Sequence, residues 1–125
     1  MRRYDPSQTP DPEEWLALDE QERMLLVEQY HRRARIKLPN TTVHATIHAA
    51  VENQLAANDE PVVRALTRLM TQGLSRHDAI HAIGSVVATQ IYNALKSKGP
   101  KDLRSDYYAE IESLTADKWL SSYDG

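Results

Sequence analysis

Apolar residues recur every three to four positions along most of the chain, and no stretch shows the two-residue alternation of a half-buried strand. A recurrence of this kind predicts amphipathic helices. The expected helices are a short segment from Pro12 and longer ones at residues 19–36, 42–57, 61–72, 75–95 and 103–120. The sequence therefore predicts an all-α fold, a bundle of four to five helices that run mostly up and down. We expect Trp15 to dock the short segment on this bundle.

Local signals indicate where several of these helices begin and end. Asp19 precedes Glu22, and Ser75 precedes Asp78, each pair with the spacing of a capping box. In that motif the first side chain accepts a hydrogen bond from the backbone of the second residue. Gly73 is placed to end the preceding helix in a left-handed conformation, which glycine adopts without steric cost.

The length and charge of the chain limit its domain organisation and its partners. Residues 1–10 carry two prolines and no periodicity, so we expect a disordered or loosely docked arm, followed by a single helical domain at 11–125. A net charge of -3 and a pI near 5.9 give no general attraction for phosphate backbones or anionic lipid. No uncharged apolar run is long enough to cross a bilayer, and the first residues do not resemble a secretion signal. We therefore expect a cytoplasmic protein with no membrane or nucleic-acid partner.

Four of the five histidines form two pairs with the same spacing. His44 and His48 lie in the second of the long helices, and His77 and His81 lie in the fourth. Residues four apart share one face of a helix, so each pair presents two imidazoles one turn apart. Because the chain has no cysteine, only nitrogen and oxygen ligands are available. The pairs predict a divalent transition-metal site, with zinc as the first candidate and iron, nickel and copper as the other metals that imidazole suits.

The expected topology places the two pairs at one end of the bundle. The connections between the long helices are short, which favours antiparallel neighbours and parallel alternate helices. Both pairs lie in the first two turns of their helices, and His31 lies near the end of the first long helix. Glu52 lies one turn beyond His48, as a further ligand or as an acceptor that orients a histidine N–H. The predicted ligands are His44, His48, His77 and His81, with Glu52 and His31 as additional candidates.

The segment His77-Asp78-Ala79-Ile80-His81 resembles the H-E-x-x-H helix of zinc metallopeptidases, with aspartate in place of glutamate. The resemblance implies that His77 and His81 bind zinc and that Asp78 acts as the general base on a metal-bound water, as in a hydrolase. Val87 occupies the place of the third histidine in the extended form of that motif. If three side chains bind the metal, an open position is left for water; if four bind, the site is closed and structural.

Other interpretations stay open. From Trp15 to Leu95 the chain resembles small bacterial helical proteins of unassigned function, which implies no activity. A metal-free interaction module, such as a homodimer or a bundle that binds a partner protein, would use the histidines as a polar layer that fixes helix register. The segment Leu69–Ile83 has the outline of a DNA-binding helix-turn-helix. No Lys or Arg occurs from His77 to Leu95, however, to contact phosphates or guanine.

Overall fold

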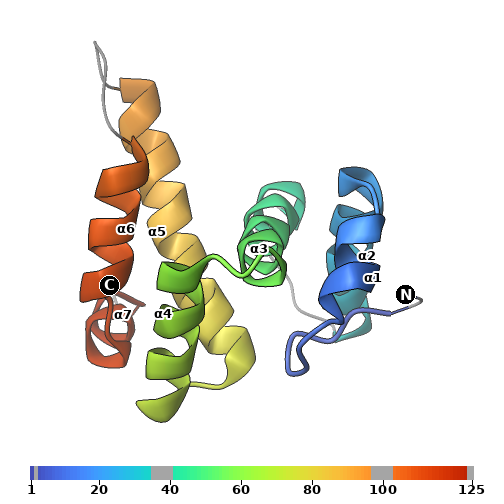
Figure 1. The fold of residues 1–125 in the computed structure, drawn as a ribbon, viewed down its shortest axis with the longest axis horizontal. Coiled ribbons are helices and arrows are strands. Elements are labelled where there is room, and N and C mark those ends of the chain that lie inside the picture. Colours follow the sequence, from blue (N-terminus) through green and yellow to red (C-terminus); the bar gives the residue numbers. More distant parts are fainter. Residues whose placement is uncertain (2, 35–40, 97–102, 124–125) are drawn as a thin grey trace.

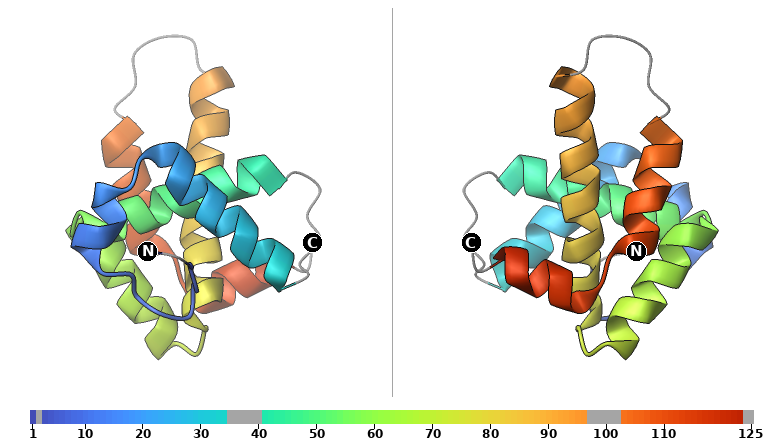
Figure 2. Two further views of the ribbon diagram at one scale, coloured as in Figure 1. Left: turned by 90° about the vertical axis from the view of Figure 1, so that its right-hand side faces the viewer. Right: turned by 90° about the vertical axis from the view of Figure 1, so that its left-hand side faces the viewer.

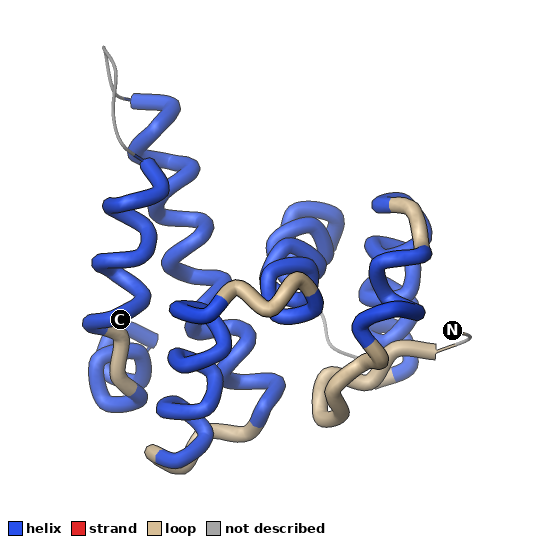
Figure 3. Tube along the Cα trace, in the orientation of Figure 1, coloured by secondary structure: helices blue, strands red, loops and turns tan. Residues whose placement is uncertain are grey.

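The computed structural model describes residue 1 and residues 3–34, 41–96 and 103–123. All regular structure in this part of the chain is helical (Figure 3), which confirms the expected all-α fold. The helices are α1 (Pro12–Ala17), α2 (Glu20–Arg33), α3 (Thr41–Ala56), α4 (Glu60–Thr71), α5 (Arg76–Lys96), α6 (Leu103–Ser113) and α7 (Ala116–Tyr123). Among the described residues, none of these helices has the length and apolarity needed to cross a membrane.

Helix α3 lies between two groups of helices (Figure 1). On one side it packs against α1 and α2, and on the other against α4 and α5, which α6 and α7 cover in turn. Each side has its own apolar core. Ala45 and Ala49 of α3 belong to the core with α1 and α2, whereas Val51 belongs to the core with α4 to α7. The strip of α3 between these two faces is where a polar layer can be enclosed.

Helices α3 and α5 cross steeply. In Figure 1 α3 is seen nearly end-on, while α5 stands upright in the plane of the picture. The turned views in Figure 2 show α3 lying across the upright α5. The expected parallel alignment of these two helices was therefore wrong, although α4, α5 and α6 do follow one another up and down. Gly84 marks the close approach, because a Cβ atom there would lie 3.0 Å from Cγ2 of Ile47.

The capping signals hold, but the last predicted helix is divided. Asp19 Oδ1 accepts from the backbone N–H of Glu22 at 2.8 Å, and Ser75 Oγ accepts from that of Asp78 at 3.1 Å. Gly73 ends its turn with a φ of 107°. In place of one helix at 103–120, α6 ends before Leu114 and α7 begins after Thr115, whose hydroxyl accepts from the backbone N–H of Lys118. With this division and the short α1, the described residues form more helices than the four to five expected.

The N-terminal arm packs far more closely than the disordered or loosely docked segment that we expected. Tyr4 has no exposed surface, and its ring centroid lies 5.5 Å from that of Trp15. Arg33 donates to the backbone carbonyl of Tyr4 at 3.0 Å, and Arg76 donates to that of Pro6 at 2.9 Å. An isolated aromatic residue among prolines carries no periodic signal, so the pattern gave no reason to bury it.

Candidate metal centre

Three helices supply the histidines. On α3, His44, His48 and Glu52 form a stripe at four-residue spacing along the strip between the two cores. On α5, His77 and His81 occupy the first two turns, one turn before Gly84 at the crossing. His31 lies in the last turn of α2. The steep crossing of α3 and α5, rather than a parallel alignment, brings the two predicted pairs together.

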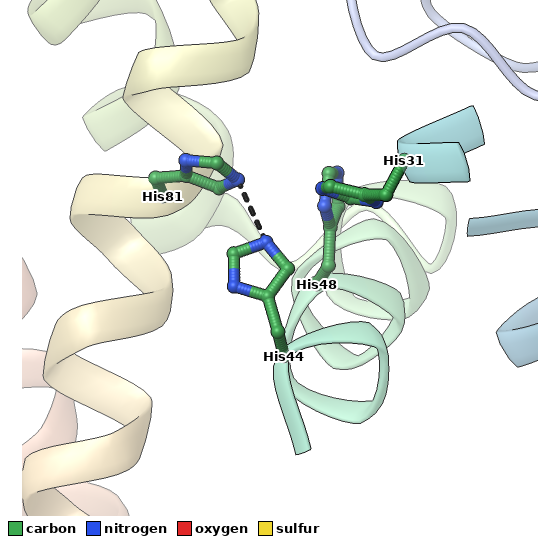
Figure 4. A group of neighbouring side chains, drawn as sticks. All are labelled: His31, His44, His48 and His81. Carbon is green, nitrogen blue, oxygen red and sulfur yellow. Dashed lines mark hydrogen bonds between the residues drawn. The ribbon is translucent and has the colours of Figure 1, made fainter. Parts of the chain in front are cut away.

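Four of the histidines have ring nitrogens that converge. One nitrogen from each of His31, His44, His48 and His81 lies within 4.8 Å of the other three (Figure 4). The closest two are Nε2 of His44 and Nε2 of His81, which are 3.1 Å apart. Four nitrogens bound tetrahedrally to zinc at about 2.0–2.1 Å lie about 3.3 Å from one another. The observed spacing therefore needs a contraction of only about 1 Å or less per nitrogen to enclose a zinc ion.

His77 lies at the edge of this group. Its ring centroid is 4.2 Å from that of His81 and 5.4 Å from that of His48, and its Nε2 is buried without a hydrogen-bond partner in the part of the chain that the structure describes. The four converging nitrogens nevertheless include His31, which was an additional candidate, and leave out His77, which was a primary one. The structure thus brings all five histidines together, but its four converging histidines are not the four that the sequence predicted as primary ligands.

The tautomer of His31 follows from the hydrogen bond of its Nδ1. Its Nδ1 lies 2.8 Å from the backbone carbonyl of Val27, one turn earlier in α2. A carbonyl only accepts, so Nδ1 carries the proton and donates it. In the neutral ring Nε2 is then an acceptor, and it is buried with no partner among residues 1, 3–34, 41–96 and 103–123. The neutral ring of His31 therefore offers Nε2 as a possible metal ligand.

A relay of three hydrogen-bonded side chains, His48, Tyr4 and Glu52, determines the tautomer of His48 in a similar way. Nε2 of His48 lies 2.7 Å from the hydroxyl of Tyr4, and that hydroxyl also hydrogen-bonds to Oε2 of Glu52. Burial, reinforced by the charge of Glu52, raises the pKa of Tyr4 far above its ordinary value, so the phenol keeps its proton and donates it to the carboxylate. The Tyr4 oxygen must then accept from His48 Nε2–H. Nδ1 of His48 is left as a buried lone pair with no hydrogen-bond partner among the described residues.

Among the described residues, the hydrogen bonds of Glu52 run to Tyr4 and Arg76 and to no histidine. Its two oxygens accept from the guanidinium of Arg76 at 2.8 and 2.9 Å, and both side chains are almost fully buried. Glu52 does not belong to the group of converging ligand atoms, which contains histidines alone. It serves instead to hold Tyr4 and to join α3 to the first residue of α5.

The environment keeps several of these imidazoles neutral, which is the form that binds metals. Burial, together with the positive charge that neighbouring histidines would carry, lowers the pKa of His44 to about 4 and that of His81 to about 3. The same causes lower the pKa of His48 still further, and burial also lowers that of His77. The positive ends of the α3 and α5 dipoles act in the same direction.

No family model, curated protein or solved structure matches this chain. Its function must therefore be inferred from its own residues, of which the histidine group is the most informative.

Asp78, the candidate general base, is exposed at the start of α5. Its backbone N–H receives the Ser75 cap, and its negative charge acts on the neighbouring His77. Asp78 thus adjoins His77, the one histidine outside the converging four, and does not belong to the converging group.

Sequence reasoning missed Tyr4 and Arg76, which complete the surroundings of His48. Arg76 stands at the start of a helix next to His77, where a basic residue is expected in solvent, and its burial depends on Glu52, 24 residues earlier. Tyr4 bonds to residues 44 and 48 positions away. No local pattern carries either contact. The only signal was indirect: Glu52 lies on the histidine stripe, beside the core, and a buried carboxylate requires a partner.

Proposed function

We propose that this chain binds one divalent transition-metal ion through His31 Nε2, His44 Nε2, His48 Nδ1 and His81 Nε2. The observation that carries the proposal is a pair of buried nitrogens, His31 Nε2 and His48 Nδ1, which have no hydrogen-bond partner among the described residues and belong to two of the four converging histidines. A buried polar atom left without a partner costs about 1–3 kcal/mol. A metal ion at the centre would satisfy both atoms at once.

The ligand set favours zinc. Neutral imidazoles suit zinc, copper, nickel and iron, whereas magnesium and calcium require oxygen ligands, which this group does not offer. Four nitrogens around one centre also agree with the tetrahedral coordination that zinc adopts in structural sites.

The geometry supports a closed, structural site more than a hydrolytic one. Four imidazoles would fill a tetrahedral zinc ion and leave no position for a reactive water. A hydrolase needs that position and a base beside it, and Asp78 is exposed next to His77 rather than next to the converging nitrogens. The metal would instead tie α2, α3 and α5 together. A DNA-binding role gains no support, because Arg76 at the start of α5 is buried against Glu52.

Titration of the metal-free protein with Co²⁺ tests the proposal, because tetrahedral cobalt absorbs visible light strongly and reports on zinc sites. We expect a tetrahedral spectrum that saturates at about one equivalent per chain. His44→Ala and His77→Ala make a matched pair, since both side chains are half-buried. We expect His44→Ala to weaken zinc affinity by about 100-fold or more, because a ligand is lost. His77→Ala should weaken it by about tenfold at most, because His77 lies outside the converging four and donates no hydrogen bond to them that the structure shows.

Two results would contradict the proposal. One is the absence of a tetrahedral cobalt spectrum in the unaltered protein, which would favour the metal-free interaction module, with the histidines as a polar layer. The other is an equal loss of affinity in the two variants, which would show that His44 is no more a ligand than His77.

A further inference from the structure

We propose that Tyr4 is a positioning residue for the metal site: its hydroxyl, held by Glu52, fixes His48 in the tautomer whose Nδ1 is free to bind. This inference rests on the proposed metal binding. It adds that the N-terminal arm, more than 40 positions before His48, is part of the site, and that His48 binds through Nδ1 because Tyr4 occupies its Nε2.

The direction of the relay follows from how many protons each group holds. Arg76 donates to both oxygens of Glu52, so the carboxylate acts only as an acceptor. Tyr4 has one hydroxyl proton, and the hydrogen bond to Glu52 uses it. The Tyr4 oxygen can then only accept from His48. If His48 carried its proton on Nδ1, two lone pairs would face each other across 2.7 Å.

The position of the Tyr4 hydroxyl is fixed from several sides. Its ring packs against Trp15 and Tyr30, at centroid distances of 5.5 and 6.3 Å. Arg33 holds the Tyr4 carbonyl. The guanidinium of Arg76 holds the carbonyl of Pro6 and Glu52 together, so one side chain anchors both the arm and the acceptor of the relay. A hydroxyl restrained in this way favours one tautomer of His48 before any metal arrives.

The same arrangement recurs in metal sites in which a carboxylate or carbonyl receives the second N–H of a histidine ligand. Val27 plays this part for His31 through its carbonyl. For His48 the carboxylate is that of Glu52, and it acts indirectly, through the hydroxyl of Tyr4. Removing such a partner typically weakens metal binding by about 10–100-fold.

Tyr4→Phe tests the inference, because it keeps the packed ring and removes only the hydroxyl. Tyr30→Phe is the matched control: its ring touches those of Tyr4, His31 and His77, but no hydrogen bond of its hydroxyl enters the relay. Nitrogen NMR of the metal-free proteins reads the tautomer of each imidazole. We expect His48 to carry its proton on Nε2 in the unaltered protein and in Tyr30→Phe, and to populate the other tautomer in Tyr4→Phe. Zinc affinity should fall about 10–100-fold in Tyr4→Phe alone.

A proton on His48 Nδ1 in the unaltered protein would overturn the inference, and this result does not depend on whether Tyr4→Phe folds. An unchanged tautomer and an unchanged zinc affinity in a folded Tyr4→Phe would overturn it as well. Because the tautomer is read without metal, these results are separate from the proposed function. If His48 has the expected tautomer but the unaltered protein binds neither Zn²⁺ nor Co²⁺, the metal-binding proposal fails and with it the positioning role of Tyr4.

Discussion

Glu52 is a charged residue with only 2% of its surface exposed, and its neighbours determine its effect on stability. Arg76 and Tyr4 together satisfy both of its oxygens. A buried ion pair of this kind adds little over a well-packed apolar pair, but the loss of one partner leaves the other charge uncompensated in the interior. Glu52, Arg76 and Tyr4 therefore depend on one another, because removing one of them leaves its buried partner unsatisfied.

Replacing Glu52 should therefore be costly even without metal. We expect Glu52→Ala to lower the free energy of unfolding of the metal-free protein by about 3–5 kcal/mol, because Arg76 is then buried without a counter-charge. Urea unfolding followed by circular dichroism measures this. Glu112→Ala is the control, since the pair of Glu112 with Arg64 is solvent-exposed and should contribute little. Equal, small effects of the two substitutions would show that the buried pair is not needed for folding.

The residues of the site differ in how far the sequence could predict them. His44, His48, His77 and His81 could be singled out because a spacing of four is a local property of a helix. That His31 rather than His77 belongs to the converging four depends on how α2 packs against α3, and residue spacing does not encode this packing. The role of Glu52 through Tyr4 depends on contacts across 48 residues.

At the scale of helices, the crossing of α3 and α5 determines whether the histidines meet. Gly84 allows it, since a side chain there would press on Ile47, which neighbours His48 on α3. The helix starts were predictable because caps are local. The crossing was not, because short connections limit how far apart helix ends lie and not the angle between the helices. The connection between α2 and α3, at 35–40, lies outside the described residues, as does the predicted end of the first long helix at 36.

A larger residue at the crossing should separate the two halves of the site. We expect Gly84→Val to move α3 away from α5, to destabilise the metal-free protein by about 1–3 kcal/mol through overpacking, and to weaken zinc binding by about tenfold or more. Ser85→Val is the control, because Ser85 is the next residue and is exposed, and it should change neither the stability nor the zinc affinity. Calorimetric zinc titration and urea unfolding measure both quantities. Tight zinc binding in Gly84→Val would mean that close approach of these helices is not required.

Across the whole molecule, the histidine layer lies where the two apolar cores meet on α3. Without metal this layer holds neutral imidazoles that acid would charge. In the unfolded chain His44 and His81 titrate near their ordinary pKa of 6.5, whereas burial holds them near 4 and 3 in the folded protein. Between these values the unfolded chain binds protons that the folded one does not, so lowering the pH favours unfolding.

The metal-free protein should therefore be most stable above about pH 6.5 and lose stability as the pH falls from there towards 3. Urea unfolding in the presence of a chelator, repeated at several pH values, gives this dependence. The His44→Ala variant should show a shallower dependence, since one of the titrating groups is absent. A stability that stays level or rises as the pH falls from 6.5 to 4 would contradict the neutral, buried state of these rings.

The central claim is that the converging imidazoles hold a metal ion, and the metal content of the protein tests it most directly. The protein should be purified without an affinity tag, because tag histidines bind metals, and analysed for all transition elements before and after reconstitution with zinc. We expect about one equivalent of a single divalent metal per chain, zinc in the first place. Less than about 0.2 equivalents of any transition metal, even after reconstitution, would contradict it.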